Sequence, residues 1–295
     1  MGEKEAFVTA KVMVIFMKKK ERGPKYLPSP LNNRMLNYRE YYMSAAEKIG
    51  FFLLTFGIGG CAGLVFYGGL FKRDGEATTA TLISNIVVFL LVGLVSVKFF
   101  LPVINEYLKN RRTKKLEKQF SDLLEGLSAS LASGGTVSDA FRNARVDLQN
   151  QYSPNEMIVC ELSEIVNGMD NGKTLEQMIL DFGKRSGIED IENFSNVISN
   201  CYRLGGNFRD VMRKTRIIIS DKMAISDEIT TKLASNKLQL RAMCLMPVVL
   251  VGLLKLSSDS FAENLSSAVG VVVTTIAVAL FVAAYFWGQK IIDIN

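Results

Sequence analysis

GGTVSDAFRNAR, at residues 134–145, sets the local pattern of the chain, and GGNFRDVMRKTR at residues 205–216 repeats it as Gly-Gly-x-apolar-x-Asp-x-apolar-Arg-x-x-Arg. A helix is expected to end at each glycine pair, which adopts positive φ without steric cost, and a new helix to begin behind a Thr or Asn cap. A weaker third copy begins at Gly172, with Thr174 as its cap. The recurrence predicts helical hairpins packed together, with structural hinges at Gly134, Gly135, Gly205 and Gly206.

Composition indicates a membrane protein with a sizeable polar domain. The chain has 295 residues, of which 48% are hydrophobic, a formal charge of +6 and a mean hydropathy of +0.19. It contains no histidine, which removes the commonest metal ligand and the commonest general base. Its four cysteines have no paired spacing, so neither a zinc site nor a disulfide framework is indicated. We therefore expect no enzymatic activity, no catalytic residues, no metal and no cofactor.

Four apolar stretches are long enough to cross a bilayer. Ile49–Phe71 and Thr79–Leu101 form an expected transmembrane hairpin at 49–101, which Pro102 is expected to close. A second hairpin at 243–295 consists of Met243–Leu256, with Pro247 tolerated inside it, and Ala268–Trp287. Residues 1–48 form a basic tail with an irregular linker at Pro24, Pro28 and Pro30. Two interpretations of its start remain open, a genuine tail or an upstream extension of a chain that begins at Met35.

Residues 102–242 form the polar domain, and helical spacing runs through all of it. One helix is expected to reach the first double glycine, others to begin at Ser153, Thr174 and Ser186, and a long one to run from Phe208 towards Leu240. No alternating strand of useful length is found, and Glu161 and Glu164 are interpreted as a solvated helix face. The predicted fold class is therefore an all-α polytopic membrane protein with about four transmembrane helices and a helical-bundle domain. Basic and acidic residues nearly balance in this domain, so no nucleic-acid partner is expected.

The distribution of charge predicts the orientation in the membrane. Lys and Arg concentrate in the N-terminal tail, in the polar domain and just after the last span, whereas the loop 257–267 holds Asp259 and Glu263 and no basic residue. Cytoplasmic segments carry the excess of basic residues. We expect both termini and residues 102–242 in the cytoplasm, and the acidic loop outside.

Two sequence motifs are candidates for binding. The stretch Gly168–Thr174 is similar to a phosphate-binding loop, but it has three residues between its glycines instead of four and does not follow a strand. It is interpreted as a turn between helices. A basic run beside the second span is expected to contact anionic lipid, and a protein partner is the alternative for the same residues. The contact residues proposed are Arg111, Arg112, Lys114 and Lys115, with Arg185 and Arg209 as further candidates.

Several segments together resemble a known family. They are Gln119–Leu124 leading to the first double glycine, Arg185-Ser186-Gly187-Ile188-Glu189-Asp190-Ile191-Glu192-Asn193-Phe194, the stretch Leu204–Asn207, and Pro247 in the following span. They resemble the type II secretion system F domain, and look most like the Tad (tight adherence) pilus platform proteins of the TadB/TadC type. The resemblance covers about residues 100–290.

This resemblance implies a multi-pass platform protein of a bacterial-type inner membrane. Such a protein is expected to couple a cytoplasmic secretion ATPase to the assembly of pilin or pseudopilin subunits. Archetypal members carry two such domains, whereas this chain has one, which implies self-association or a homologous platform protein as partner. Two alternatives are a membrane-anchored regulatory or sensory scaffold that binds a cytoplasmic partner and, less favoured because few polar groups lie inside the spans, a small-solute channel.

Overall fold

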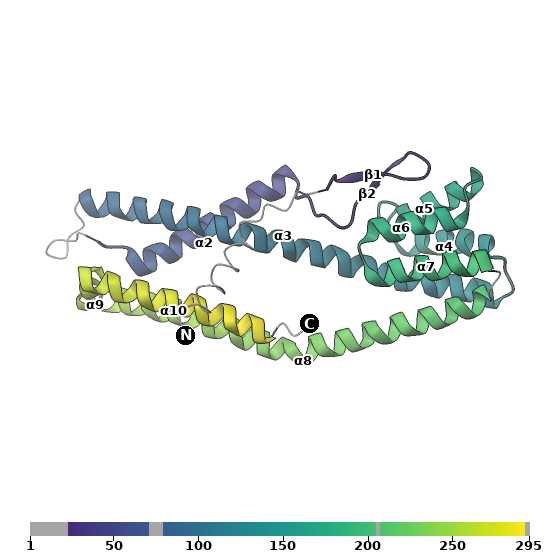
Figure 1. Ribbon diagram of the computed structural model, residues 1–295. Helices are drawn as coiled ribbons and strands as arrows, with labels where there is room; N and C mark the ends of the chain where they lie inside the picture. The colour runs from purple at the N-terminus through teal and green to yellow at the C-terminus, as the bar shows by residue number, and fades with distance from the viewer. Residues whose placement is uncertain (1–22, 71–78, 205–206, 293–295) are drawn as a thin grey trace, which may run out of the picture. The chain divides into compact units, whose positions relative to one another are not determined.

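The computed structural model describes residues 23–70, 79–204 and 207–292 (Figure 1). These residues are almost entirely helical, which confirms the all-α prediction. The strands β1 (Tyr26–Pro28) and β2 (Arg34–Leu36) are short. The helices are α2 (Ala45–Tyr67), α3 (Thr79–Ala132), α4 (Val137–Gln151), α5 (Met157–Asp170), α6 (Leu175–Ser186), α7 (Glu189–Leu204), α8 (Phe208–Ser257), α9 (Asp259–Ser266) and α10 (Ala268–Ile292).

The chain divides into two compact units. Among the described residues, one unit contains 23–42, 113–204 and 207–212, and the other contains 43–70, 79–112 and 213–292. We call them the polar unit and the apolar unit. Helices α3 and α8 each belong partly to one unit and partly to the other.

The apolar unit contains four helices long and apolar enough to cross a membrane, as predicted: α2, α3, α8 and the Ala268–Tyr285 part of α10. Helix α2 begins at a capping box in which Ser44 and Glu47 satisfy each other's backbone N–H groups. Glycines then bring α2 against α3. A Cβ atom added at Gly59, Gly60 or Gly63 would lie within 2.2, 2.4 and 2.8 Å of Ser96, Phe89 and Val92, so only glycine permits this approach.

Neither helix-interior proline ends a helix. Helix α3 runs for 54 residues with Pro102 inside it, so the expectation that Pro102 closes the second span was wrong. Proline removes one backbone donor, and long helical segments on both sides continue the helix at that cost. Helix α8 runs for 50 residues through Pro247. The prediction that the helix tolerates Pro247 is confirmed. The helix predicted from Phe208 and the span predicted at Met243–Leu256 are parts of this one helix.

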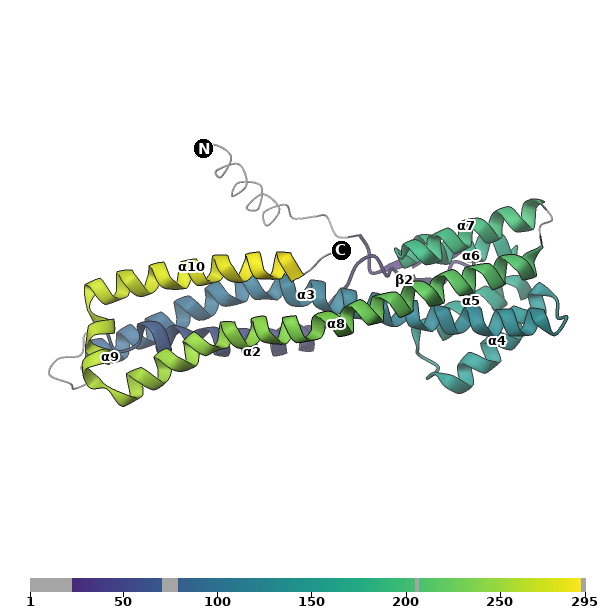
Figure 2. The same ribbon diagram turned by 90° about the horizontal axis from the view of Figure 1, so that it is seen from below.

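The polar unit is built around the C-terminal part of α3, beside which α5, α6 and α7 lie in both views (Figures 1 and 2). The leucine-rich stripe predicted on this helix is its core-facing side, and its members are all buried: Leu116, Phe120, Leu123, Leu124, Leu127 and Leu131. The Phe120 ring stands edge-on to Phe194 of α7, with ring centroids 5.1 Å apart, and lies 6.4 Å from Phe182 of α6. These aromatic contacts join three helices in one apolar core.

The turns between helices follow the predicted chemistry. Gly134 has φ +94° after α3, and Thr136 and Asp139 form a capping box at the start of α4. Gly172 has φ +75°, and the Thr174 side chain accepts a hydrogen bond from the backbone N–H of Gln177. Gly205 and Gly206 lie outside the described residues.

Two predicted helix starts were wrong. Ser186 is the last residue of α6, followed by Gly187 in the left-handed conformation, and α7 begins only at Glu189. Residues 153–156 form a turn, in which the Glu156 N–H donates to the Ser153 carbonyl at 2.9 Å, and α5 begins only at Met157. The Glu156 carboxylate accepts hydrogen bonds from Lys115 at 2.7 Å and Gln119 at 2.8 Å, both on α3. These long-range bonds hold Glu156 outside the helix, so it cannot complete a local capping box.

Residues 26–36 form a β-hairpin, so the prediction of an irregular linker at Pro24, Pro28 and Pro30 was wrong. Strands β1 and β2 pair antiparallel, with Leu27 opposite Met35. In the connecting loop, Asn32 has φ 62°, a conformation that asparagine tolerates better than most residues. The Ser29 side chain accepts hydrogen bonds from the N–H groups of Leu31 and Asn33, both at 3.2 Å. Local polar bonds, rather than an alternating apolar pattern, therefore shape this hairpin.

Candidate functional site

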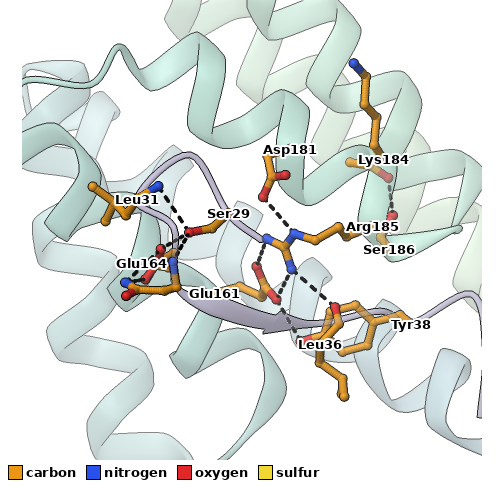
Figure 3. A network of polar contacts seen from close by, with 12 residues as sticks. Ser29, Leu31, Leu36, Tyr38, Glu161, Glu164, Asp181, Lys184, Arg185 and Ser186 are labelled. Carbon is orange, nitrogen blue, oxygen red and sulfur yellow. Dashed lines mark hydrogen bonds and ion pairs between the residues drawn. The ribbon is translucent and has the colours of Figure 1, made fainter. Parts of the chain in front are cut away.

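A buried ionic cluster joins the N-terminal hairpin to helices α5 and α6, and its centre is Arg185 (Figure 3). Two guanidinium nitrogens of Arg185 donate to the two carboxylate oxygens of Glu161, at 2.7 and 2.6 Å. The third, Nε, donates to Asp181 at 2.7 Å, one helical turn earlier on α6. The side chains of Arg185 and Glu161 are 3% and 1% exposed. Such a two-pronged pair is the geometry in which a guanidinium and a carboxylate bind most strongly.

The hairpin supplies further partners to this pair. The Tyr38 hydroxyl donates to Glu161 at 2.9 Å, and the Leu36 carbonyl accepts from Arg185 at 3.3 Å. The backbone N–H of Tyr38 also donates to the Arg185 carbonyl at 3.0 Å. The end of β2 and the residues just after it thus complete the coordination of a charge that belongs to α6.

A second carboxylate of α5, Glu164, binds the tip of the hairpin. The Ser29 hydroxyl donates to it at 2.5 Å, and the Asn33 side-chain amide donates to both of its oxygens, at 3.0 and 3.2 Å. Ser29 and Glu164 are both buried. Because Glu161 and Glu164 are three residues apart, they share one side of α5 and bind the two ends of the hairpin.

Arg39 extends the contact at the rim of the cluster. Its Nε donates to the Lys184 carbonyl at 2.8 Å, and its guanidinium lies 3.5 Å from a Glu192 oxygen, with both side chains about half exposed. Gly187 has φ +64°, and a Cβ atom there would lie 2.5 Å from the Arg39 side chain. Glycine is required at this position both by its backbone conformation and by the close approach of Arg39.

Burial controls the acid–base behaviour of the cluster. Burial raises the pKa of the Tyr38 phenol well above its ordinary value, and the neighbouring Glu161 carboxylate adds to that rise. Burial also raises the pKa of Glu161, against the opposing effect of Arg185. For Arg185, burial favours the neutral form, but Glu161 and Asp181 outweigh it and raise the pKa. Arg185 therefore stays charged and supplies the compensation that a carboxylate at this depth requires.

This geometry corrects two sequence-based interpretations. Glu161 and Glu164 do not form a solvated face, because both are buried beneath the hairpin. Arg185 is not an exposed contact residue, because two carboxylates and a carbonyl occupy its guanidinium. The cluster therefore has a structural role. It holds the hairpin, α5 and α6 together through charge-assisted hydrogen bonds, and its buried groups are not open to a substrate.

The other predicted contact residues are separate from this cluster. Arg111 and Lys114 are exposed on α3 and Arg209 is exposed on α8, whereas Arg112 is half-buried. Lys115 forms an ion pair with Glu156, with a nitrogen–oxygen distance of 2.7 Å. The structure therefore leaves Arg111 and Lys114 as the members of the basic run that are most available to an outside partner.

The stretch Gly168–Thr174, which is similar to a phosphate-binding loop, forms the end of α5 and the turn that leads to α6. This is the turn between helices that the sequence predicted. Among the described residues, no group of three or more His, Cys, Asp or Glu side chains could hold a metal ion.

Comparison with known proteins adds a family to this fold. No curated protein and no solved structure gives a significant match to the chain. Residues 123–254 match the model of the family described as type II secretion system (T2SS), protein F. The match runs from α3 to α8, so it includes Glu161, Glu164 and Arg185 and leaves out the hairpin that they bind. Residues 123–254 are therefore similar to the T2SS F domain.

Proposed function

We propose that this protein is an inner-membrane platform of a Tad-type pilus or a type II secretion machine, which couples a cytoplasmic secretion ATPase to the assembly of pilin or pseudopilin subunits. The F domain at residues 123–254 is the observation that carries this proposal. In this role the protein needs no catalytic group, because its partner hydrolyses the nucleotide. In this role the protein is proposed to assemble with a second copy of itself or with a homologous platform protein.

Continuous helices supply the means of coupling. Helices α3 and α8 pass between the two units without a break, through Pro102 and Pro247 respectively. A displacement of the polar unit is therefore carried along two helices into segments of membrane-spanning length. A transition that moves rigid elements as bodies is the usual physical basis of such coupling.

The buried cluster adds a third connection. Tyr42 ends the hairpin segment, and only Met43 and Ser44 separate it from the first residue of α2. Because Arg185 and Glu164 hold this segment against α5 and α6, the start of α2 is tethered to the F domain within a few residues. The cluster is thus proposed to transmit movement of α5 and α6 to the first span.

Charges in the apolar unit support a cytoplasmic F domain. Lys255 near the end of α8 donates to the Val65 carbonyl at 3.2 Å, and Gly69 after α2 donates to Asn85 of α3 at 2.9 Å. These contacts gather the end of α2, the start of α3 and the end of α8 at one side, where Asp259 and Glu263 follow. Lys48 and Arg111 therefore lie towards the opposite side, and the excess of basic residues there supports the proposal that this side faces the cytoplasm.

The proposal is tested in the source organism. Deleting the gene should abolish surface pili or the secreted pilin-like subunits, and the full chain expressed from a plasmid should restore them. Tagged protein purified in detergent should also recover the organism's secretion ATPase in amounts well above a control multi-pass protein. Normal assembly in the deletion strain would contradict the platform role. Altered pilin expression with intact assembly would instead favour a regulatory scaffold.

A further inference from the structure

We propose that one exposed face of α3 is a binding site for anionic phospholipid headgroups. Residues at spacings of three and four line this face: Phe100, Val103, Tyr107, Arg111, Lys114 and Lys118. All six are exposed, and the three uncharged ones retain 55%, 52% and 65% of their accessible surface. We call this face the α3 ladder.

The order of side chains along the ladder matches the layers of a membrane surface. Two apolar residues come first, then Tyr107, then three cations in succession. Tyrosine is enriched at the level of the headgroups, and Lys or Arg side chains favour the layer beyond it. The adjacent face of the same helix differs, because Leu101, Ile104, Leu108 and Arg112 are half-buried. Exposed side chains beside the ladder include Glu106 and Asn110, but the exposed cations Arg111, Lys114 and Lys118 all lie on the ladder itself.

Length supports the same placement of the membrane surface. Helix α3 begins at Thr79, and at about 1.5 Å per residue Tyr107 lies about 42 Å further along. A bilayer including its headgroup regions is about 40–45 Å thick. Since Pro102 does not end the helix, α3 continues unbroken to Tyr107, where the proposal places the membrane surface.

The distance of each cation from Tyr107 along the helix sets how strongly it is attracted to anionic lipid. Arg111 lies about 6 Å beyond Tyr107 along the axis, Lys114 about 10 Å and Lys118 about 16 Å. The attraction of a basic side chain to anionic lipid falls off within a Debye length of about 8–10 Å. Arg111 is therefore the principal headgroup contact, Lys114 contributes less, and Lys118 lies largely beyond reach. A lipid partner requires this gradient, whereas a cytoplasmic protein that docks on the ladder does not.

The experiment measures lipid preference at the ladder itself. The chain has one tryptophan, Trp287, so the variant Trp287→Phe/Tyr107→Trp places its sole indole at position 107. The full-length variant is reconstituted in vesicles of phosphatidylcholine with phosphatidylglycerol, one of the two lipids being brominated to quench the indole. We expect stronger quenching by the anionic lipid. Adding Arg111→Gln should lower this preference about fivefold, which corresponds to about 1 kcal/mol for one cation near the surface.

The matched control is Lys118→Gln, which removes an equal charge from the same face and should change the preference by less than about twofold. Adding Lys114→Gln to Arg111→Gln should lower it further, and raised salt should mimic both changes. An equal effect of Lys118→Gln and Arg111→Gln would overturn the proposal, as would an unchanged preference. If Arg111→Gln/Lys114→Gln left lipid preference intact but abolished recovery of the ATPase in lipid-free detergent, the ladder would be a protein-docking face.

Discussion

Arg185 and Glu161 lie on consecutive helices and meet through two hydrogen bonds of 2.7 and 2.6 Å, where their side chains are 3% and 1% exposed. A pair at this depth is costly to break, because the remaining charge stays buried without its partner. We expect Arg185→Met or Glu161→Met to destabilise the protein by about 3–5 kcal/mol. Denaturant unfolding of the full chain in detergent measures the change. The double variant should lose less than the sum of the single losses, because it leaves no uncompensated charge at the centre.

The matched control is the exposed ion pair between Arg142 and Asp170, whose side chains are 47% and 42% exposed. Arg142→Met should cost no more than about 1 kcal/mol, since solvent screens surface pairs. Equal losses at Arg185 and Arg142 would mean that the buried cluster does not hold the hairpin in place.

The hairpin gives a second prediction. A chain begun at Met35 lacks β1, Ser29 and Asn33, and with them the hydrogen bonds that these two residues donate to Glu164. We expect it to unfold at a lower temperature and to exchange amide hydrogens faster across α5. In the full chain, Glu164→Met should cost about 1–3 kcal/mol, because it leaves the Ser29 and Asn33 donors unsatisfied.

In the chain begun at Met35, the same Glu164→Met substitution should be nearly neutral, because its donors are already absent. Equal effects in the two backgrounds would show that the tip of the hairpin contributes nothing through Glu164.

The helices were predictable because their signals are local. The Thr136 cap, the Ser44 capping box and the leucine-rich stripe of α3 each depend on residues within a few turns. The hairpin gave no such signal, since its strands are three residues long and its partner Glu164 is 131 residues from Asn33. Its stability comes from contacts that a local pattern cannot contain.

The buried cluster did leave a detectable trace. On α5, Glu161 falls within the stripe that also contains buried Ile158, Leu162 and Ile165, and on α6 Arg185 follows buried Met178 and Phe182 at helical spacing. Opposite charges at core positions of consecutive helices predict a buried ion pair. Sequence patterns could therefore have paired Glu161 with Arg185, but not with Tyr38, which comes from the N-terminal segment.

Gly134 allows backbone conformation to be tested alone. Its φ is +94°, and no atom lies within 4 Å of a Cβ placed there, so a side chain would meet no obstacle other than the backbone. Gly134→Val should destabilise the full chain by about 1–2 kcal/mol, and Gly134→Asn by less, because asparagine tolerates positive φ.

The control position is Gly126, which lies inside α3, where a Cβ would make an ordinary 3.5 Å contact with Ala144. Gly126→Ala should therefore stabilise by about 0.5–1 kcal/mol. A loss of stability in both Gly134→Val and Gly126→Ala would contradict the argument that the backbone conformation of each glycine decides the effect.

Glu156 predicts a dependence on pH. Hydrogen bonds from Lys115 and Gln119 lower the pKa of its carboxyl group below the ordinary value of 4.5. A carboxyl group whose pKa is lower in the folded state adds stability above its unfolded pKa, and this contribution is lost as pH falls through the folded pKa. Unfolding free energy should thus drop below about pH 4.5, and drop less in Glu156→Gln. Identical pH profiles for wild type and variant between pH 3 and 6 would exclude Glu156 as a source of the acid sensitivity.

The orientation of the apolar unit gives the last prediction. Fluorescent-protein fusions after Asn207 and Asn295 should report the cytoplasm, and a phosphatase fusion after Glu263 should be active outside it. The physical reason is that Asp259 and Glu263 follow the end of α8, whereas Lys48 and Arg111 lie towards the opposite side of the unit. Asp259→Lys/Glu263→Lys reverses the charge of this short loop and should lower the phosphatase signal, while Asp259→Asn/Glu263→Gln should leave it nearly unchanged, because acidic residues contribute little to orientation. Phosphatase activity from a fusion after Asn207 would place the F domain outside the cytoplasm, where no secretion ATPase could reach it, and the platform proposal would fail with it.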